Sequence, residues 1–394
     1  MRPVKNIFEY LPPKELEPIK EFAKDKVAPF WIIDLKKIGR KYDELQKNLP
    51  FAKIYYAVKA NPATEVIQLL GQRGSNFDVA SVYEIHQLLS LGISPERMSY
   101  GNPIKKDLEI RYAYQNGIRL FATDSFGDVE ALAREAPGSR IIFRLLLDGS
   151  STADWPLSRK FGCHQGMVYD LVVKAKELGL EPYGLCFHVG SQQRDLGQWD
   201  TALGQCSHIF SELKKIGIQL KAIDLGGGLP AKYIYPTPDT EEYVEAIKKY
   251  LKDEFNGDLP EIIIEPGRSI TGDSGVMIAE VVNVATKSTH SSIPWVFLDV
   301  GKFRGLIETI DESIKYPIFV ERHLEEPADD YEEMILAGPS CDSMDVMYEN
   351  HKCKLPADIK RGDRVFILTT GAYTYSYTSV CFNGFPPPPV YFIN

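Results

Sequence analysis

The stretch Tyr55-Tyr56-Ala57-Val58-Lys59-Ala60-Asn61-Pro62 decides the fold that this sequence predicts. Its aromatic and β-branched residues are typical of a buried strand, and the Asn-Pro pair ends that strand. Lys59 lies near the exit, where an ammonium group without a partner is costly to bury. Most strand lysines extend the charged end of the side chain into solvent. The other interpretation is a reactive amine that condenses with a carbonyl group, which lysines do once desolvation has lowered the amine pKa.

Length and composition predict a globular protein with more than one core. The chain has 394 residues, and its formal net charge of −9 argues against a nucleic-acid partner or an anionic membrane surface. No apolar run reaches the ~18 residues of a transmembrane helix, and the first residues lack a signal-peptide core. We therefore expect no membrane association and a cytoplasmic location. The scattered cysteines fit no zinc pattern, so we expect free thiols and no metal site. They are Cys163, Cys186, Cys206, Cys341, Cys353 and Cys381.

Eight strand-like runs alternate with amphipathic helical segments over the first two thirds of the chain. Eight such units in ~230 residues fit a closed (β/α)8 barrel of the TIM type. A doubly wound sheet is the alternative, but eight regular repeats favour closure. The expected strands are Lys53–Ala60, Asn76–Ser81, Met98–Asn102, Arg119–Asp124, Arg140–Asp148, Gly184–Gly190, Ala222–Gly228 and Glu261–Arg268.

Beyond Arg268 the pattern changes to strands without long helices between them, which predicts a separate β-sandwich or β-barrel domain. The strand-like run Phe30–Leu35 precedes the barrel and can join that second domain. We therefore expect three parts of the chain. Residues 1–36 contribute to the β domain, residues 37–270 form the barrel, and residues 271–394 form the C-terminal β domain.

Polar residues lie within several expected barrel strands or at their carboxyl ends. They are Lys59, Asp78, Arg144, His188 and Glu265. Each has an ordinary explanation by itself, such as a core histidine or a structural ion pair. In a barrel, however, the carboxyl ends of the strands meet at one mouth, where the chemistry of such folds is found. The five side chains are therefore predicted to converge on one pocket.

A glycine triplet, Gly226-Gly227-Gly228, follows the expected seventh strand, and Arg268 follows the eighth. The triplet could be only a turn and Arg268 only part of a surface ion pair. After a barrel strand, however, glycines expose main-chain N–H groups, which bind phosphate. A reactive lysine, a phosphate cradle and an acid that can face a ring nitrogen together indicate a pyridoxal phosphate site.

Four motifs occur in an order that resembles a known family. The chain is similar to the alanine-racemase-fold, pyridoxal-phosphate-dependent basic amino acid decarboxylases, from about Phe30 to the C-terminus. The motifs Gly338-Pro339-Ser340-Cys341-Asp342-Ser343 and Gly371-Ala372-Tyr373 narrow the resemblance toward ornithine decarboxylase. The four family motifs are Tyr56-Ala57-Val58-Lys59-Ala60-Asn61, His188-Val189-Gly190-Ser191, Gly226-Gly227-Gly228 and Glu265-Pro266-Gly267-Arg268.

The resemblance implies a role for each matched residue of the cofactor site. Lys59 binds pyridoxal phosphate covalently, Glu265 pairs with the pyridine nitrogen, and His188 stacks on the ring face. Asp78 and Arg144 support the lysine and the ring hydroxyl. The implied phosphate ligands are Ser191, Gly226, Gly227, Gly228, Gly267, Arg268 and Tyr373.

Further residues are implied to handle the substrate. Cys341, which could otherwise be an inert thiol, manages protonation after carbon dioxide leaves. Asp342, together with Asp311 or Glu308, holds the distal ammonium group, and Phe382 forms an aromatic wall. The register between Asp311 and Glu312 stays open, because Phe303 replaces a tyrosine found in animal ornithine decarboxylases. In this departure the chain resembles the bacterial and plant branch of the family, some members of which also accept lysine.

The implied activity is decarboxylation of L-ornithine to putrescine, with L-lysine to cadaverine as a second reaction. In the family, two subunits form a homodimer with shared active sites, and the Cys341-Asp342 loop reaches the neighbouring barrel. Three alternatives remain: a diaminopimelate decarboxylase, an amino acid racemase, and a non-catalytic regulator similar to the antizyme inhibitors. A racemase needs a second base on the face opposite the lysine. The regulators lack key cofactor-binding or proton-transfer residues of the family, whereas all of the matched residues are present here.

Overall fold

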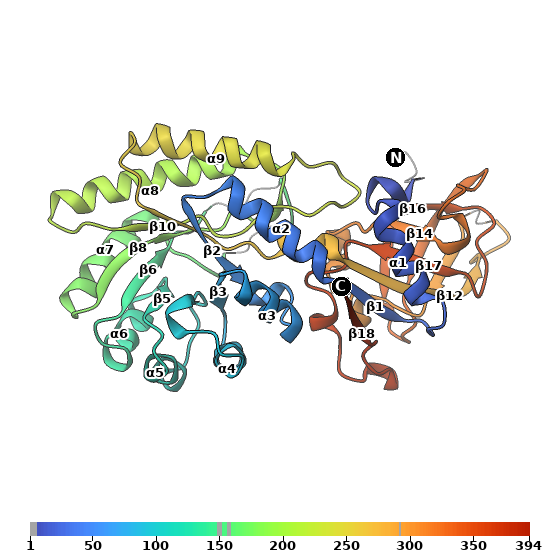
Figure 1. The fold of residues 1–394 in the computed structure, drawn as a ribbon, viewed down its shortest axis with the longest axis horizontal. Coiled ribbons are helices and arrows are strands. Elements are labelled where there is room, and N and C mark those ends of the chain that lie inside the picture. Colours follow the sequence, from blue (N-terminus) through green and yellow to red (C-terminus); the bar gives the residue numbers. More distant parts are fainter. Residues whose placement is uncertain (1–5, 148–151, 156–158, 291–292) are drawn as a thin grey trace. The chain divides into compact units, whose positions relative to one another are not determined.

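The computed structural model describes residues 6–147, 152–155, 159–290 and 293–394. The chain divides into two compact units (Figure 1). The barrel unit comprises residues 39–230 and 237–269, and the β unit comprises residues 1–38, 231–236 and 270–394, as far as they are described. Asp148, which we expected at the end of the fifth barrel strand, lies outside the described residues.

The barrel unit contains a closed barrel of eight parallel strands, which confirms the expected (β/α)8 architecture (Figure 1). The last strand pairs with the first, through Ile262 and Ala52, and so closes the sheet. The strands are short and almost wholly buried, as parallel strands covered on both faces are. In order they are β2 (Ala52–Ala57), β3 (Asn76–Val79), β4 (Met98–Tyr100), β5 (Leu120–Thr123), β6 (Arg140–Arg144), β8 (Glu181–Cys186), β10 (Ala222–Asp224) and β11 (Glu261–Ile264).

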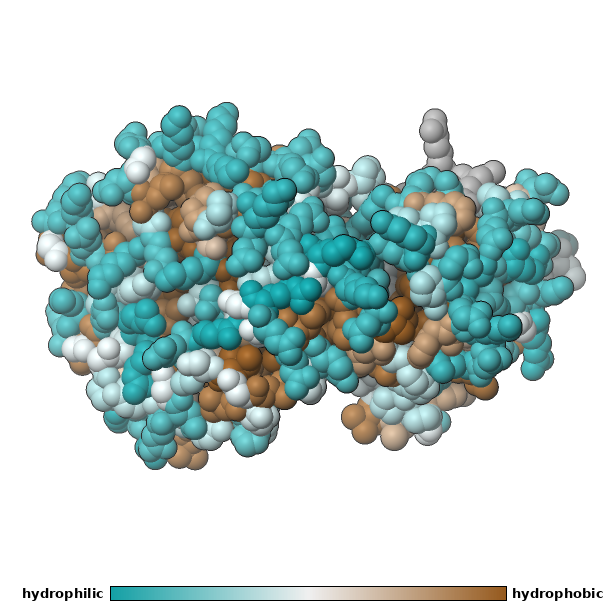
Figure 2. Space-filling view, in the orientation of Figure 1, coloured by the Kyte–Doolittle hydropathy of each residue, from teal (hydrophilic) through white to brown (hydrophobic). Residues whose placement is uncertain are grey.

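Helices surround the strands of the barrel unit, and on that unit Figure 2 shows mainly hydrophilic side chains over them. Some of their first turns are capped as the sequence suggests: Ser81 accepts from the Glu84 N–H, and Asp239 and Glu242 form a reciprocal capping box. No helix in the described ranges is long and apolar enough to cross a membrane. The helices are α2 (Leu35–Asn48), α3 (Thr64–Gln72), α4 (Val82–Ser90), α5 (Asp107–Gln115), α6 (Phe126–Glu135), α7 (Gln165–Glu177), α8 (Gly197–Lys215) and α9 (Thr240–Phe255); α2 crosses the unit boundary.

Short elements complete the barrel unit. A two-stranded sheet pairs β7 (Ala153–Trp155) with β9 (Ser191–Gln193). Two 3-10 turns are η2 (Val58–Ala60), directly after β2, and η3 (Pro95–Arg97), and α10 (Arg268–Thr271) crosses into the β unit.

The β unit is built on one mixed sheet, which confirms the expected separate β-rich domain. Strand β12 pairs with three other strands of this sheet, β1, β13 and β17. Strand β1 also pairs in parallel with β18. The N-terminal strand therefore joins this domain, as expected. The strands are β1 (Phe30–Asp34), β12 (Gly275–Ala285), β13 (Trp295–Leu298), β14 (Ile318–Val320), β15 (Tyr331–Ala337), β16 (Val346–Pro356), β17 (Arg364–Leu368) and β18 (Val390–Ile393).

Helical pieces of the β unit are short. One α-helix, α1 (Pro13–Ala23), buries Leu16, Ile19 and Ala23 in a core that it shares with β1 and β12. The 3-10 turns are η1 (Ile7–Glu9), η4 (Gly272–Ser274), η5 (Lys302–Arg304), η6 (Ile307–Glu312), η7 (Glu321–His323), η8 (Tyr375–Tyr377) and η9 (Phe382–Gly384).

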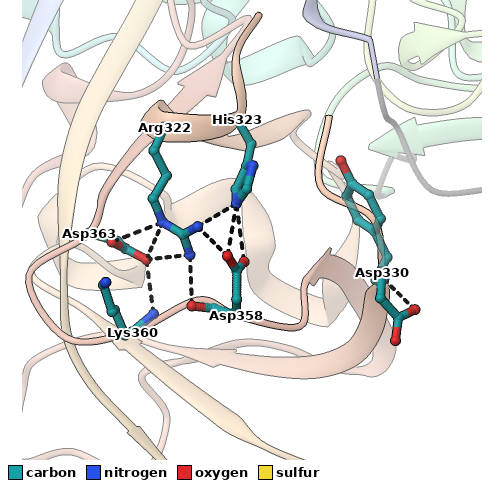
Figure 3. Close-up of polar contacts among 7 residues, drawn as sticks. Arg322, His323, Asp330, Asp358, Lys360 and Asp363 are labelled. Carbon is teal, nitrogen blue, oxygen red and sulfur yellow. Dashed lines mark hydrogen bonds and ion pairs between the residues drawn. The ribbon is translucent and has the colours of Figure 1, made fainter. Parts of the chain in front are cut away.

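A charged cluster joins η7 to the connection between β16 and β17 (Figure 3). The Arg322 guanidinium forms ion pairs with Asp358 and, at 3.2 Å, with Asp363. His323 Nε2 lies 3.1 Å from Asp358 Oδ1. The hydrogen bond from Arg322 holds the pKa of Asp358 down at about 2. The contacts of Asp358 in this cluster therefore favour the folded state of the β unit while Asp358 is ionised.

Candidate active site

A pocket at the carboxyl ends of the barrel strands brings together Lys59, Asp78, Arg144, His188 and Glu265. These are the five strand-end residues that the sequence analysis singled out. Lys59 differs in its local structure, because β2 ends at Ala57 and Lys59 lies in the following 3-10 turn, η2. The pocket is also lined by Ser99, Gly101, Ala122, Ile142, Cys186, Phe187 and Asp224.

The Lys59 amine forms an ion pair with Asp78, with Nζ and Oδ2 3.3 Å apart. Asp78 is almost fully buried, whereas the Lys59 side chain is about half exposed (48%), so the lysine is less desolvated than the sequence suggested. The other Asp78 oxygen accepts a hydrogen bond from Ser99 Oγ at 3.4 Å. A Cβ at Gly101 would lie only 2.0 Å from that oxygen, so glycine makes room for the carboxylate. Asp78 thus holds the Lys59 amine at the pocket.

The imidazole of His188 is neutral and has a defined tautomer. Its Nδ1 atom accepts the main-chain N–H of Gly190 at 3.1 Å, so the proton resides on Nε2. Burial, followed by the charges of Arg144 and Lys59, lowers the pKa of His188 to about 3. The ring therefore presents an uncharged aromatic face to the pocket.

Glu265 directly follows β11 and is hydrogen-bonded to Asp224, the last residue of the neighbouring strand β10. Burial raises the pKa of Asp224 to about 6. Burial, followed by the charge of Asp224, raises the pKa of Glu265 well above its usual range. The two carboxyl groups therefore share one proton at neutral pH. The sequence analysis missed Asp224, although a carboxylate at the end of an otherwise apolar barrel strand was the signal.

The glycine triplet, Ser191 and Arg268 lie near one another beside the pocket. Gly226 and Gly228 have φ values of +63° and +106°, which strain other residues, and a Cβ at Gly227 would lie 2.8 Å from the Glu265 carbonyl oxygen. Arg268 is buried, and its Nε donates to Ser191 Oγ at 3.1 Å. Gly267 immediately precedes Arg268. A guanidinium, a hydroxyl and a glycine loop form the donor set that a phosphate group requires.

The donor set of the barrel unit fits pyridoxal phosphate in each of its parts. The amine can bind a carbonyl, the protonated carboxyl pair can face a ring nitrogen, and the neutral imidazole can lie against a ring. Among the described residues, no group of three or more histidine, cysteine and acidic side chains is arranged to hold a metal ion.

The β unit carries the other predicted residues. Cys341 is exposed in the connection between β15 and β16, and the neighbouring Asp342 accepts the Met344 N–H at 2.8 Å. The Phe382 ring, in η9, packs against Phe303 with ring centroids 4.9 Å apart. Tyr373 follows β17 with a φ of +53°. These four residues all belong to the β unit.

The three carboxylates of η6 differ in environment. Glu308 is buried, at 2% exposed, whereas Asp311 is exposed and has a φ of +52°. Glu312 accepts the main-chain N–H groups of three consecutive residues of β16 at 2.6 to 2.7 Å. Glu312 is thus engaged in holding β16, which leaves Asp311 as the exposed carboxylate of this segment.

Comparisons with known proteins agree with the site. The family described as "Pyridoxal-dependent decarboxylase, pyridoxal binding domain" matches residues 35–272. A lysine/ornithine decarboxylase of Selenomonas ruminantium is 31% identical over 93% of this chain and 90% of its own length. Antizyme inhibitor 2 of Xenopus laevis is 30% identical over 92% of this chain and 80% of its own length.

A solved structure has the same fold over almost the whole chain. It is the lysine/ornithine decarboxylase of Vibrio vulnificus complexed with putrescine, at a TM-score of 0.84 and 28% identity, covering 98% of this chain and 99% of that one. The family match covers more than half of the 394 residues and includes every strand that surrounds the pocket. The resemblance seen in the motifs is thereby confirmed, and this chain belongs to the family of pyridoxal-dependent decarboxylases.

Proposed function

We propose that this protein decarboxylates a basic L-diamino acid, L-ornithine to putrescine, with L-lysine to cadaverine as a second reaction. The observation that carries the proposal is the pocket that joins Lys59, Asp78, His188 and Glu265 in a barrel of this family. The similarity to relatives named for lysine and ornithine decarboxylation supports the substrate class. Putrescine and cadaverine are polyamine precursors, so the reaction belongs to polyamine biosynthesis.

The barrel unit would hold the cofactor through residues with distinct tasks. Bound pyridoxal phosphate supplies an electron sink for the electron pair left when carbon dioxide departs. Asp78 positions the Lys59 amine for covalent attachment, and Glu265 keeps a proton at the ring nitrogen. His188 covers one ring face, and Arg144 supports the ring hydroxyl. The phosphate ligands from the barrel unit would be Ser191, Gly226, Gly227, Gly228, Gly267 and Arg268, and Tyr373 of the β unit would be a further one.

The β unit would handle the substrate. Cys341 would deliver the proton that replaces the lost carboxylate, because its exposed thiol is a suitable acid. Asp342 would bind the distal ammonium group, with Asp311 favoured over Glu308 as its partner because Asp311 is exposed. Phe382 would contact the aliphatic part of the substrate. Together these groups select a diamino acid.

The proposal also covers the oligomeric state of the protein and its location in the cell. We infer a homodimer with two composite sites, in which the Cys341-Asp342 loop of one subunit completes the barrel site of the other. The net charge of −9 and the free cysteines at the described positions are compatible with a cytoplasmic protein.

A non-catalytic regulator is the alternative that a specific observation supports, since Antizyme inhibitor 2 is among the relatives. Against it stands the presence of every residue that the proposed reaction uses, including Lys59, Glu265 and Cys341. Catalysis is therefore the stronger proposal.

One experiment tests these candidates together. Purified protein with pyridoxal phosphate is incubated in parallel with ornithine, lysine, arginine and diaminopimelate, and amines, lysine and the enantiomers of each substrate are separated. We expect putrescine from ornithine and cadaverine from lysine, and almost no product of either kind with Lys59→Ala. Lysine formed from diaminopimelate, or D-amino acids without carbon dioxide, would identify the decarboxylase or racemase alternative. No turnover of any substrate by protein that binds the cofactor would contradict an enzymatic role.

A further inference from the structure

The connection between β15 and β16 takes its shape from one buried carboxylate, that of Asp345. Asp345 is 3% exposed, and its Oδ1 accepts the Lys302 N–H at 2.8 Å. Its Oδ2 accepts the main-chain N–H of Ser340 at 3.1 Å and the Ser340 hydroxyl at 2.7 Å. The carboxylate therefore ties the residue before Cys341 to the first residue of η5.

The surrounding main chain packs directly on this carboxylate. A Cβ at Gly301 would lie 2.2 Å from Asp345 Oδ1, and a Cβ at Gly338 would lie 2.3 Å from Oδ2. Two main-chain hydrogen bonds close the loop, from Gly338 to the Asp345 carbonyl at 2.7 Å and from Asp345 to the Asp342 carbonyl at 3.1 Å. The position of Cys341 and Asp342 thus depends on Asp345 and not on contacts of their own side chains with a core.

A second contact fixes Cys341 from another segment. Asn383, in η9, accepts the main-chain N–H of Cys341 on its Oδ1 at 2.7 Å. Asn383 has a φ of +53°, a conformation that asparagine tolerates and that aims its side chain at the loop. Its segment is anchored to η5, because Phe382 packs on Phe303 and the Ser379 N–H donates to the Phe303 carbonyl at 2.9 Å.

We propose that Asp345 and Asn383 are positioning residues, which set where the Cys341 thiol and the Asp342 carboxylate lie. This inference rests on the proposed function, in which Cys341 delivers a proton and Asp342 binds the distal ammonium group. A single torsion separates the cysteine main chain from its sulfur, so the place of the sulfur follows the place of the main chain. A displacement of about 1 Å between reacting groups is enough to slow a reaction strongly.

Asn383 offers a clean pair of variants. Asn383→Gly removes the acceptor and keeps the positive φ, and Asn383→Asp keeps both the acceptor and a tolerance of that φ. For Asn383→Gly we expect kcat on ornithine to fall about 2- to 10-fold, with KM nearly unchanged. This fall corresponds to the free energy that one hydrogen bond contributes. Asn383→Asp should recover most of that loss. In a Cys341→Ala background, Asn383→Gly should have no further effect on kcat.

Asp345→Asn tests the other contact. An amide has one acceptor oxygen, so either the Lys302 N–H or the Ser340 groups would face its NH2. Because Asp342 then moves together with Cys341, we expect KM to rise and kcat to fall in this variant. If Asp345→Asn does not fold, the Asn383 series still decides the proposal.

Thiol reactivity supplies a readout that does not depend on turnover. Cys341 and Cys381 are the exposed cysteines at the described positions, and the other four are buried. The holoenzyme is treated with iodoacetamide, and the alkylation of both peptides is followed by mass spectrometry. In Asn383→Gly the ratio of the Cys341 rate to the Cys381 rate should change about threefold or more, with Asn383→Asp close to wild type.

The outcomes separate this inference from the proposed function. An equal loss of kcat for Asn383→Gly with and without Cys341, or an unchanged alkylation ratio, would show a general structural role and overturn the proposal. A changed ratio in a protein that decarboxylates no amino acid would retain the positioning of Cys341 while the proposed function fails.

Discussion

The carboxyl groups of Asp224 and Glu265 share a hydrogen bond at the ends of the neighbouring strands β10 and β11. Both pKa values are raised, that of Asp224 to about 6, so the native cofactor-free protein binds more protons than the unfolded chain above the ordinary carboxyl pKa of about 4. The pair therefore lowers the free energy of unfolding as pH rises from about 4 through the raised pKa values.

Asp224→Asn should make the free energy of unfolding depend less on pH. The amide oxygen can still accept the Gly226 N–H, which binds Asp224 Oδ1 at 2.9 Å, while its NH2 donates to Glu265. Removing the neighbouring charge lowers the pKa of Glu265, so less stability is lost on going from about pH 5 to pH 8. Denaturant unfolding of the cofactor-free protein at several pH values measures this, and parallel curves for variant and wild type would refute the shared proton.

Lys59→Ala should abolish the visible absorbance of bound cofactor and lower kcat by a factor on the order of 10³ or more. The reason is that the pocket then has no amine beside Asp78. Lys53→Ala is a matched control, because Lys53 lies in β2, just before the turn that carries Lys59, but pairs with Glu261 at 2.7 Å and is exposed. A lysine adduct fixed by borohydride in Lys59→Ala would refute the assignment.

Asp342→Ala should lower kcat/KM for ornithine, which corresponds to a loss of about 2–5 kcal/mol of transition-state stabilisation if the carboxylate is a desolvated partner of the distal ammonium group. Asp311→Ala should act in the same direction, whereas Glu312→Ala should mainly destabilise the fold, by about 1–3 kcal/mol, because three main-chain N–H groups lose their acceptor. Steady-state kinetics beside thermal unfolding separates the two effects. Unchanged kinetics in Asp342→Ala would move its role to Asp311 or Glu308.

Mixing Lys59→Ala subunits with Cys341→Ala subunits should restore activity. If sites are shared, one site of each heterodimer combines an intact Lys59 with an intact Cys341, and the other site carries both defects. Random exchange makes half of the dimers heterodimers, so recovery should approach about a quarter of wild-type activity. A mixture that stays inactive after subunit exchange has been verified would mean that each chain completes its own site.

The Arg322–Asp358 pair should make the β unit sensitive to acid. Because the pKa of Asp358 is lowered to about 2, its contribution to stability is complete above about pH 4 and is lost as pH falls toward 2. Asp358→Asn should therefore reduce the acid-induced loss of stability. Asp330→Asn is a useful control, because that carboxylate accepts only the N–H of its neighbour Tyr331 in Figure 3. Equal acid curves for the two variants would contradict the prediction.

The barrel was predictable because each of its strands and helices can be recognised from the residues within it. Each β-α unit shows its own apolar run and its own amphipathic helix, and polar residues at the run ends had to meet once the barrel closed. The end of β2 was misplaced because it is decided from a distance: the Ala57 N–H donates to the Pro266 carbonyl at 3.1 Å, after which the chain turns at Lys59. The sequence around Lys59 does not predict such a contact with a distant residue.

The β unit was harder to predict. The sequence pattern predicts strands at Val276–Thr286, Trp295–Val300, Met334–Ala337, Arg364–Thr370 and Val390–Ile393. It does not predict β16, in which charged and polar residues interrupt the apolar pattern, or the short β14. The pairing of β12 with three partners depends on contacts between distant segments, which periodicity does not encode. Asp345 and Asn383 were missed for the same reason, because their importance follows from the loops they join and not from a motif.

The pairing of β1 with both β12 and β18 has a consequence for biosynthesis. On the ribosome, the apolar strand β1 emerges before any barrel strand, yet its partners at residues 275–278 and 390–393 emerge only after every barrel strand. Every barrel strand is available before then, so the barrel can form while β1 still has two unpaired edges. The interval between these events is when the nascent chain is most open to aggregation, and chaperones that bind exposed strands would act there.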